Sequence, residues 1–143
     1  MNSDPTFWIA SRAAGVAALL LLTCSVLLGL TLGGRLAGPG ARGFFRASNL
    51  KRLHERSAQA GLALIGLHGL LLLGDDWLHP TLSQLAIPFT LEHRPVFTGL
   101  GVIAGYGMLL FGLSYYARDA IGRVRWAKLH RFSLAAWVLA VTH

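Results

Sequence analysis

Four long apolar runs constrain the fold of this chain more than any other feature. A helix that crosses a bilayer needs about 20 mostly apolar residues. The candidate helices span about residues 8–32, 53–73, 96–116 and 126–143. Hydrophobic residues make up 54% of the chain and charged residues only 13%, too few charges to cover a soluble surface without large apolar patches. We therefore expect an all-α integral membrane bundle of four transmembrane helices, surrounded by membrane lipid.

Lysine and arginine are concentrated in the first and third connections between these runs. The cations are Arg35, Arg42, Arg46, Lys51, Arg52 and Arg56 around the first, and Arg118, Arg123, Arg125, Lys128 and Arg131 around the third. The second connection holds Asp75, Asp76, Glu92 and Arg94, and the N-terminal tail holds Asp4. Because basic loops stay in the cytoplasm, we expect a plasma or inner membrane protein with its N-terminus outside. With this placement we expect the cations behind the net charge of +7 to interact with lipid head groups, and we expect no nucleic-acid partner.

The N-terminal run could also be a cleaved signal peptide. However, residues 1–7 carry no positive charge, and the run is longer than a typical signal core. A retained helix is the better interpretation.

Histidines recur inside two of the runs at matching depths. The second run carries His54 and, fourteen residues later, His68, whereas the fourth run carries His130 and, thirteen residues later, His143. Both runs leave the cytoplasmic side in the same direction, so His54 is level with His130 and His68 is level with His143. The two levels are about 20 Å apart at 1.5 Å per helical residue. Ionisable groups at such depths are costly and indicate function.

Two facing histidines at each level are typical of a haem whose iron takes one imidazole on each face. We therefore predict two haem b groups, with all four histidines as metal ligands. Zinc needs about four clustered donors, and each level offers two. Cys24 is the only cysteine, which excludes an internal disulfide, and its apolar surroundings predict a small core residue.

Helical rotation places His54 and His68 near one face of their helix, but it does not do so for His130 and His143. Fourteen residues bring His68 to within about 40° of His54, but thirteen residues leave His143 about 140° from His130 on an ideal helix. The fourth helix therefore needs a π-bulge, a kink or a rotated approach. With no glycine or proline between the two histidines, the sequence does not locate this adjustment.

The chain resembles the ferric-reductase-like transmembrane domain family. The resemblance rests on the Arg12–Gly15 pattern, the segment LHERSAQAGLALIGLHG and the segment WAKLHRFSLAAWVLAVTH. It covers about residues 8–143, so we expect a single domain over residues 1–143. That family includes ferric reductases, NADPH oxidases and the haem subunit of a bacterial methionine-sulfoxide reductase system. The resemblance implies that His54 pairs with His130 on the cytoplasmic side and His68 with His143 on the outer side.

The resemblance also implies transmembrane electron transfer, from a cytoplasmic flavin reductase or quinol to an external acceptor such as ferric iron, oxygen or a periplasmic redox partner. Larger relatives append a flavin and nicotinamide-nucleotide domain, for which this chain has no room. We therefore expect an oxidoreductase component without its own flavin domain. We also expect that the chain is truncated before a further helix.

Arg12 has two interpretations. It either snorkels to the interface or pairs with a propionate of the outer haem as a cofactor-binding residue. Two other functions also remain open for the whole chain. One is a haem-free membrane anchor or assembly subunit, and the other is a proton-coupled transporter that titrates the histidines.

Overall fold

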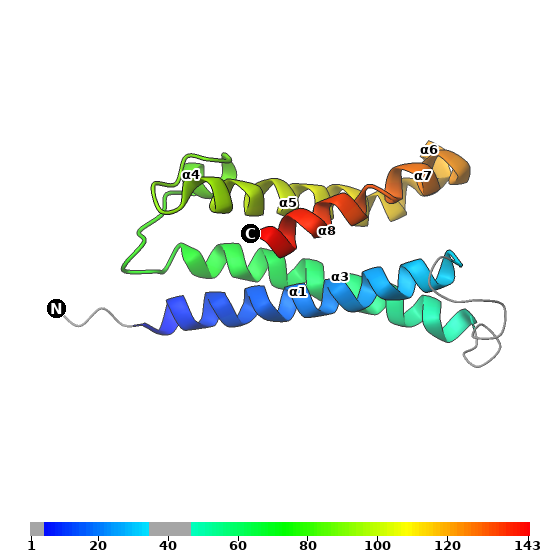
Figure 1. Cartoon of the computed structure of the whole chain (residues 1–143), viewed down its shortest axis with the longest axis horizontal. Coiled ribbons are helices and arrows are strands. Elements are labelled where there is room, and N and C mark those ends of the chain that lie inside the picture. Colours follow the sequence, from blue (N-terminus) through cyan, green and yellow to red (C-terminus); the bar gives the residue numbers. More distant parts are fainter. Residues whose placement is uncertain (1–4, 35–46) are drawn as a thin grey trace.

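The computed structural model describes residues 5–34 and 47–143, and within them every regular element is a helix (Figure 1). The elements are α1 (Thr6–Leu32), α3 (Ala47–Leu72), α4 (Leu82–Ala86), α5 (Pro95–Leu113), the 3₁₀ turn η1 (Ser114–Ala117), α6 (Arg118–Ile121), α7 (Arg123–His130) and α8 (Ser133–Thr142). The prediction of an all-α chain is confirmed. Asp4, Arg35, Arg42 and Arg46, which entered the orientation argument, lie outside the described residues.

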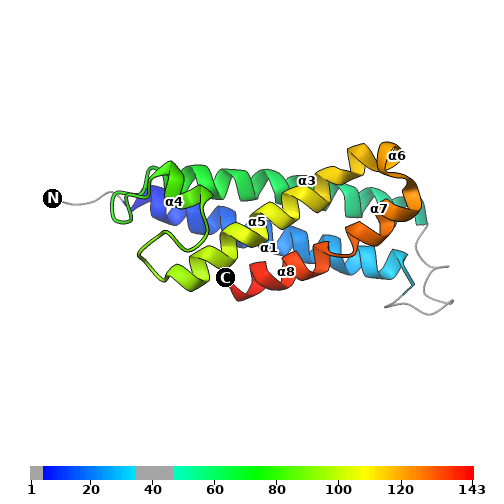
Figure 2. The same cartoon turned by 90° about the horizontal axis from the view of Figure 1, so that it is seen from above.

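The long helices form two pairs. Helix α1 packs along α3, and α5 packs along α8. The two pairs lie one above the other in Figure 1, and successive long helices run in opposite directions. The start of α3 and the α6–α7 segment consequently share one end of the bundle, whereas α4 lies at the other end (Figures 1 and 2). The described cations of the two basic connections therefore lie at the same end.

Small residues allow the helices of each pair to approach closely. A Cβ atom added to Gly61 of α3 would lie 2.7 Å from Cγ of Leu22 in α1. A Cβ atom added to Gly107 of α5 would lie 2.8 Å from Cβ of Ala136 in α8. Both distances are shorter than a normal van der Waals contact, so larger residues at these positions would push the helices apart.

A small core joins the two pairs. Leu22, Met108 and Ala136 are buried together, and Trp137 packs against them. The indole Nε1 of Trp137 donates a hydrogen bond of 2.9 Å to Oγ1 of Thr23, which ties α8 to α1.

Large apolar side chains point outward from the long helices. Leu20 of α1, Leu70 of α3 and Leu110 of α5 are 66%, 67% and 66% exposed. Among the described residues, two stretches are long and apolar enough to cross a membrane, namely α1 and the segment Pro95–Ile121. The first half of α3 carries several charged residues, and α8 has only 10 residues, so neither of these helices has a spanning length of uncharged sequence within its own bounds.

The fourth run, predicted over 126–143 with an adjustment between its two histidines, is divided into two helices. Helix α7 ends at His130, and α8 begins at Ser133. At this break the amide of Phe132 donates to the carbonyl of Leu129 (3.0 Å), and the amide of Leu134 donates to that of Arg131 (3.2 Å). These three-residue bonds wind the chain more tightly than an α-helix. They supply part of the extra rotation that the thirteen-residue histidine spacing requires.

Two other features differ from the sequence-based expectations. Cys24 is exposed on α1, so the prediction of a core residue is wrong; the inward positions of this stretch belong to Leu22 and Ser25. The connection between α3 and α5 contains the unpredicted α4, which begins with a capping box between Thr81 and Gln84. The hydroxyl of Tyr106 in α5 donates to the carbonyl of Ala86 (2.6 Å) and fastens this connection to the bundle.

Candidate functional site

The structure brings the four predicted histidines together as two facing pairs. The ring centroids of His54 and His130 are 6.2 Å apart, with their planes at 89°. The ring centroids of His68 and His143 are 6.5 Å apart, with their planes at 72°. The pairing that we expected from depth alone is therefore the pairing found, although thirteen residues on an ideal helix would have turned His143 away.

Each imidazole is held by the same kind of bond. In all four rings Nδ1 lies within hydrogen-bond distance of a backbone carbonyl: His54 to Ser25 (2.8 Å), His68 to Ser11 (2.8 Å), His130 to Phe111 (3.2 Å) and His143 to Phe97 (2.7 Å). A carbonyl oxygen can only accept, so Nδ1 must carry the proton. The neutral ring then leaves the lone pair of Nε2 free to act as a metal ligand.

The acceptors are spaced like the histidines. Ser11 and Ser25 of α1 are fourteen residues apart, as are Phe97 and Phe111 of α5. Helix α1 thus holds both histidines of α3, and α5 holds His130 and His143. The bundle repeats one arrangement at two depths.

Two serines make additional contacts that the sequence argument missed. The hydroxyl Oγ of Ser25 lies 3.0 Å from Nδ1 of His54 and donates to the carbonyl of the same histidine at 3.1 Å. Ser11 does the same for His68, at 3.0 and 3.2 Å. Ser11 and Ser25 are only 1% and 4% exposed. A visible signal was available, because each serine begins a Ser-x-x-x-Gly pattern and the two patterns have the spacing of the histidine pair on α3.

Glycines make room for three of the rings. A Cβ atom on Gly15 would lie 3.1 Å from Nδ1 of His68, and one on Gly29 would lie 3.2 Å from Cε1 of His54. A Cβ atom on Gly101 of α5 would collide with the ring of His143. Gly15 is the glycine of the Arg12–Gly15 pattern, so one weak element of the family resemblance lies directly against a predicted ligand.

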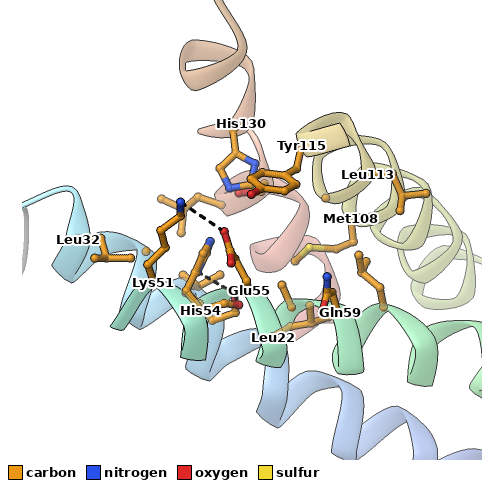
Figure 3. A pocket seen from close by; sticks show the side chains of 18 of the residues that line it. Leu22, Leu32, Lys51, His54, Glu55, Gln59, Met108, Leu113, Tyr115 and His130 are labelled. Carbon is orange, nitrogen blue, oxygen red and sulfur yellow. Dashed lines mark hydrogen bonds and ion pairs between the residues drawn. The ribbon is translucent and has the colours of Figure 1, made fainter. Parts of the chain in front are cut away.

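A cavity of about 1170 Å³ opens at the level of His54 and His130. Figure 3 shows the two rings pointing toward each other across it, from α3 and from α7. Its inner wall is apolar and includes Leu22, Leu62 and Met108. Polar residues also line it, among them Arg131 and an ion pair between Lys51 and Glu55 with nitrogen and oxygen 3.8 Å apart. The cavity can therefore take a large, mostly apolar group that has an anionic edge.

Arg12 lies beside the outer pair but faces away from the helix contact. Its side chain is exposed, and the guanidinium carbon lies 4.2 Å from the centre of the Trp8 ring. The neighbouring Ser11 is the residue that contacts His68. This stacking is the kind of contact expected of an interfacial anchor.

Within residues 5–34 and 47–143, no group of three or more histidine, cysteine, aspartate or glutamate side chains is placed to hold a metal ion. Each level brings two histidine side chains together. Comparison with known proteins found no matching family model, no similar curated sequence and no similar solved structure.

Proposed function

We propose that this chain is a four-span membrane protein that binds two b-type haems and passes electrons across the bilayer. The separation of the paired rings carries the proposal. A ring nitrogen lies about 2 Å from a bound metal ion and about 1 Å from its own ring centroid, so imidazoles on opposite sides of one metal have centroids about 6 Å apart. The separations of 6.2 and 6.5 Å match this value.

The surroundings of the rings support haem in particular. The four Nδ1–H bonds fix the tautomer that presents Nε2. The apolar cavity at the inner level exceeds the ordinary range for a small-molecule site, about 300–1,000 Å³, and suits a flat macrocycle. At the inner level, Lys51 and Arg131 are the candidate cations for the propionates. At the outer level the candidate is Arg12, whose side chain would have to leave the ring of Trp8 to reach a propionate.

Two bound haems would allow the bundle to transfer electrons across the membrane. A bis-histidine haem gains and loses one electron at its iron and leaves no coordination site for a substrate. The protein fixes the two levels about 20 Å apart along α3, and Trp137 packs between them, six residues from His143 and seven from His130. The family resemblance supports a flow from a cytoplasmic flavin reductase or quinol to an external acceptor.

The proposed topology follows from the two ends of the bundle. All four long segments present apolar side chains outward, including Leu70 of α3 and Val138 of α8. The basic end would lie in the cytoplasm and the α4 end outside. Broken helices are tolerated at membrane depth where the freed backbone groups are satisfied internally, and between α7 and α8 the amides of Phe132 and Leu134 are hydrogen-bonded to nearby carbonyls.

A haem count on the purified protein tests the proposal. We expect two haems per chain with low-spin b-type bands in the reduced-minus-oxidised spectrum. His68→Ala and His54→Ala should each retain one haem, whereas His79→Ala, in the outer connection, should retain two. A folded protein that binds no haem when supplied with it would overturn the proposal and favour a haem-free anchor or a transporter.

A further inference from the structure

The hydroxyl groups of Ser11 and Ser25 are unusual among those on the long helices. A serine or threonine inside a helix ordinarily bonds to a carbonyl one turn earlier on its own helix. Thr23, Thr31 and Ser57 do so, at 2.7, 2.8 and 2.8 Å. Ser11 and Ser25 instead bond to a different helix, at residues 57 and 29 positions away. Their hydroxyls are therefore committed to His68 and His54.

The direction of each bond follows from the atoms involved. The carbonyl of the histidine can only accept, so the serine hydroxyl donates its single hydrogen there. The oxygen of that hydroxyl is then free to accept from Nδ1–H, 3.0 Å away in both sites. Nδ1–H is consequently shared between the serine carbonyl at 2.8 Å and the serine hydroxyl. In contrast, each histidine of the α7–α8 segment has one carbonyl partner.

Resting on the proposed function, we propose that Ser11 and Ser25 are positioning residues that separately set the reduction potentials of the two haems. A hydrogen bond from Nδ1–H makes the imidazole a stronger electron donor to its metal. Stronger donation stabilises the oxidised iron and lowers the potential. The second acceptor that each serine provides therefore holds the potential of one haem below the value given by the carbonyl alone.

The glycine of each Ser-x-x-x-Gly pattern completes the arrangement. Gly15 and Gly29 follow one turn after the serines on the same side of α1, and each lies against the ring that its serine holds. The serine fixes the rotation of the ring while the glycine leaves room for it. Each half of α1 therefore serves one histidine, and the two potentials can be adjusted independently.

Redox titration of Ser11→Ala and Ser25→Ala tests the inference in the full chain loaded with haem. Ser11→Ala should raise the potential of the outer haem alone, and Ser25→Ala that of the inner haem alone, with two haems retained in each. The His68→Ala and His54→Ala backgrounds assign each potential. Thr31→Ala removes a hydroxyl that donates to the carbonyl of Leu27 in its own helix and should change neither potential.

Ser→Cys variants serve as a second test, since a thiol is a weaker donor and acceptor of similar shape. We expect smaller rises in the same direction. Unchanged potentials in both Ala variants, with two haems bound, would overturn the inference and leave the proposed function standing. If an Ala variant loses its haem, a raised potential in the Cys variant supports the inference and a parental potential overturns it. A parent protein without haem would overturn the proposed function itself.

Discussion

The indole ring of Trp126 stacks on the imidazole of His130, with ring centroids 5.0 Å apart and planes 25° apart. Its Nε1 donates to Oγ of Ser114 (3.1 Å), and that hydroxyl donates to the carbonyl of Phe111 (2.6 Å). The same carbonyl accepts from Nδ1 of His130. Trp126 therefore braces the inner ring both by stacking and through a shared backbone acceptor.

Trp126→Ala should weaken haem binding at the inner level. Losing a group that orients a metal-binding histidine typically costs 10–100-fold in affinity, so we expect inner haem to transfer to an apo-globin acceptor about tenfold faster. Trp126→Phe keeps a ring for stacking and should lie between the parent and the Ala variant. The control is Trp77→Ala, which removes an indole ring that contacts a different histidine, His93. Equal transfer rates in all four proteins would contradict the bracing role.

Gly101→Ala should remove the outer haem and leave the inner one. Any Cβ atom at this position collides with the ring of His143, so the ring must leave its place between α5 and α3. Gly105→Ala is a matched control one turn further along α5, because its Cβ atom would make only an ordinary contact, 3.8 Å from Ile65. Haem content per chain is the measurement. Two haems in Gly101→Ala would show that the ring is not confined as the structure describes.

The angles between the imidazole planes predict an electron paramagnetic resonance signature. Planes at 89° and 72° are far from parallel, and such bis-histidine ferric haems give highly anisotropic low-spin signals. We expect the inner haem, with the larger angle, to give the more anisotropic signal of the two. Spectra of His68→Ala, which keeps the inner haem, provide the assignment. Rhombic signals typical of parallel rings at both levels would count against the observed geometry.

Much of the candidate site was predictable from spacing alone. Both runs that carry histidines start at the same side, so counting residues was enough to pair His54 with His130. The position of the His143 ring was harder to predict, because it depends on the break in the helix at residues 131 and 132. That break contains no glycine or proline to indicate it, and the contact of Phe132 at the break with Phe111 of α5 is visible only in the folded bundle.

The supporting residues were missed for a different reason. A lone serine in an apolar helix ordinarily bonds to a carbonyl of its own helix, so the sequence does not single out Ser11 or Ser25. Only the shared fourteen-residue spacing connects them with the histidines, and that match has meaning once α1 is known to pack on α3. In contrast, α4 was visible in principle, since Thr81 and Gln84 form the usual capping-box pattern.

Labelling from the two sides of a membrane tests whether α5, one of the four proposed spans, crosses it. In a Cys24→Ala background, Gln84→Cys lies near the α4 end and Asp119→Cys near the α6–α7 end. With vesicles of uniform orientation, a membrane-impermeant maleimide should label one of these cysteines from outside and the other only after the vesicles are opened. Labelling of both from the same side would exclude an odd number of crossings between them.

Electron flow across sealed vesicles tests transmembrane conduction most directly. Haem-loaded protein is reconstituted with ferricyanide trapped inside, and dithionite is added outside. We predict that the trapped ferricyanide is reduced much faster than in protein-free vesicles, and that His54→Ala or His68→Ala abolishes the gain. Vesicles whose protein carries both haems but which pass electrons no faster than protein-free vesicles would contradict the proposed function.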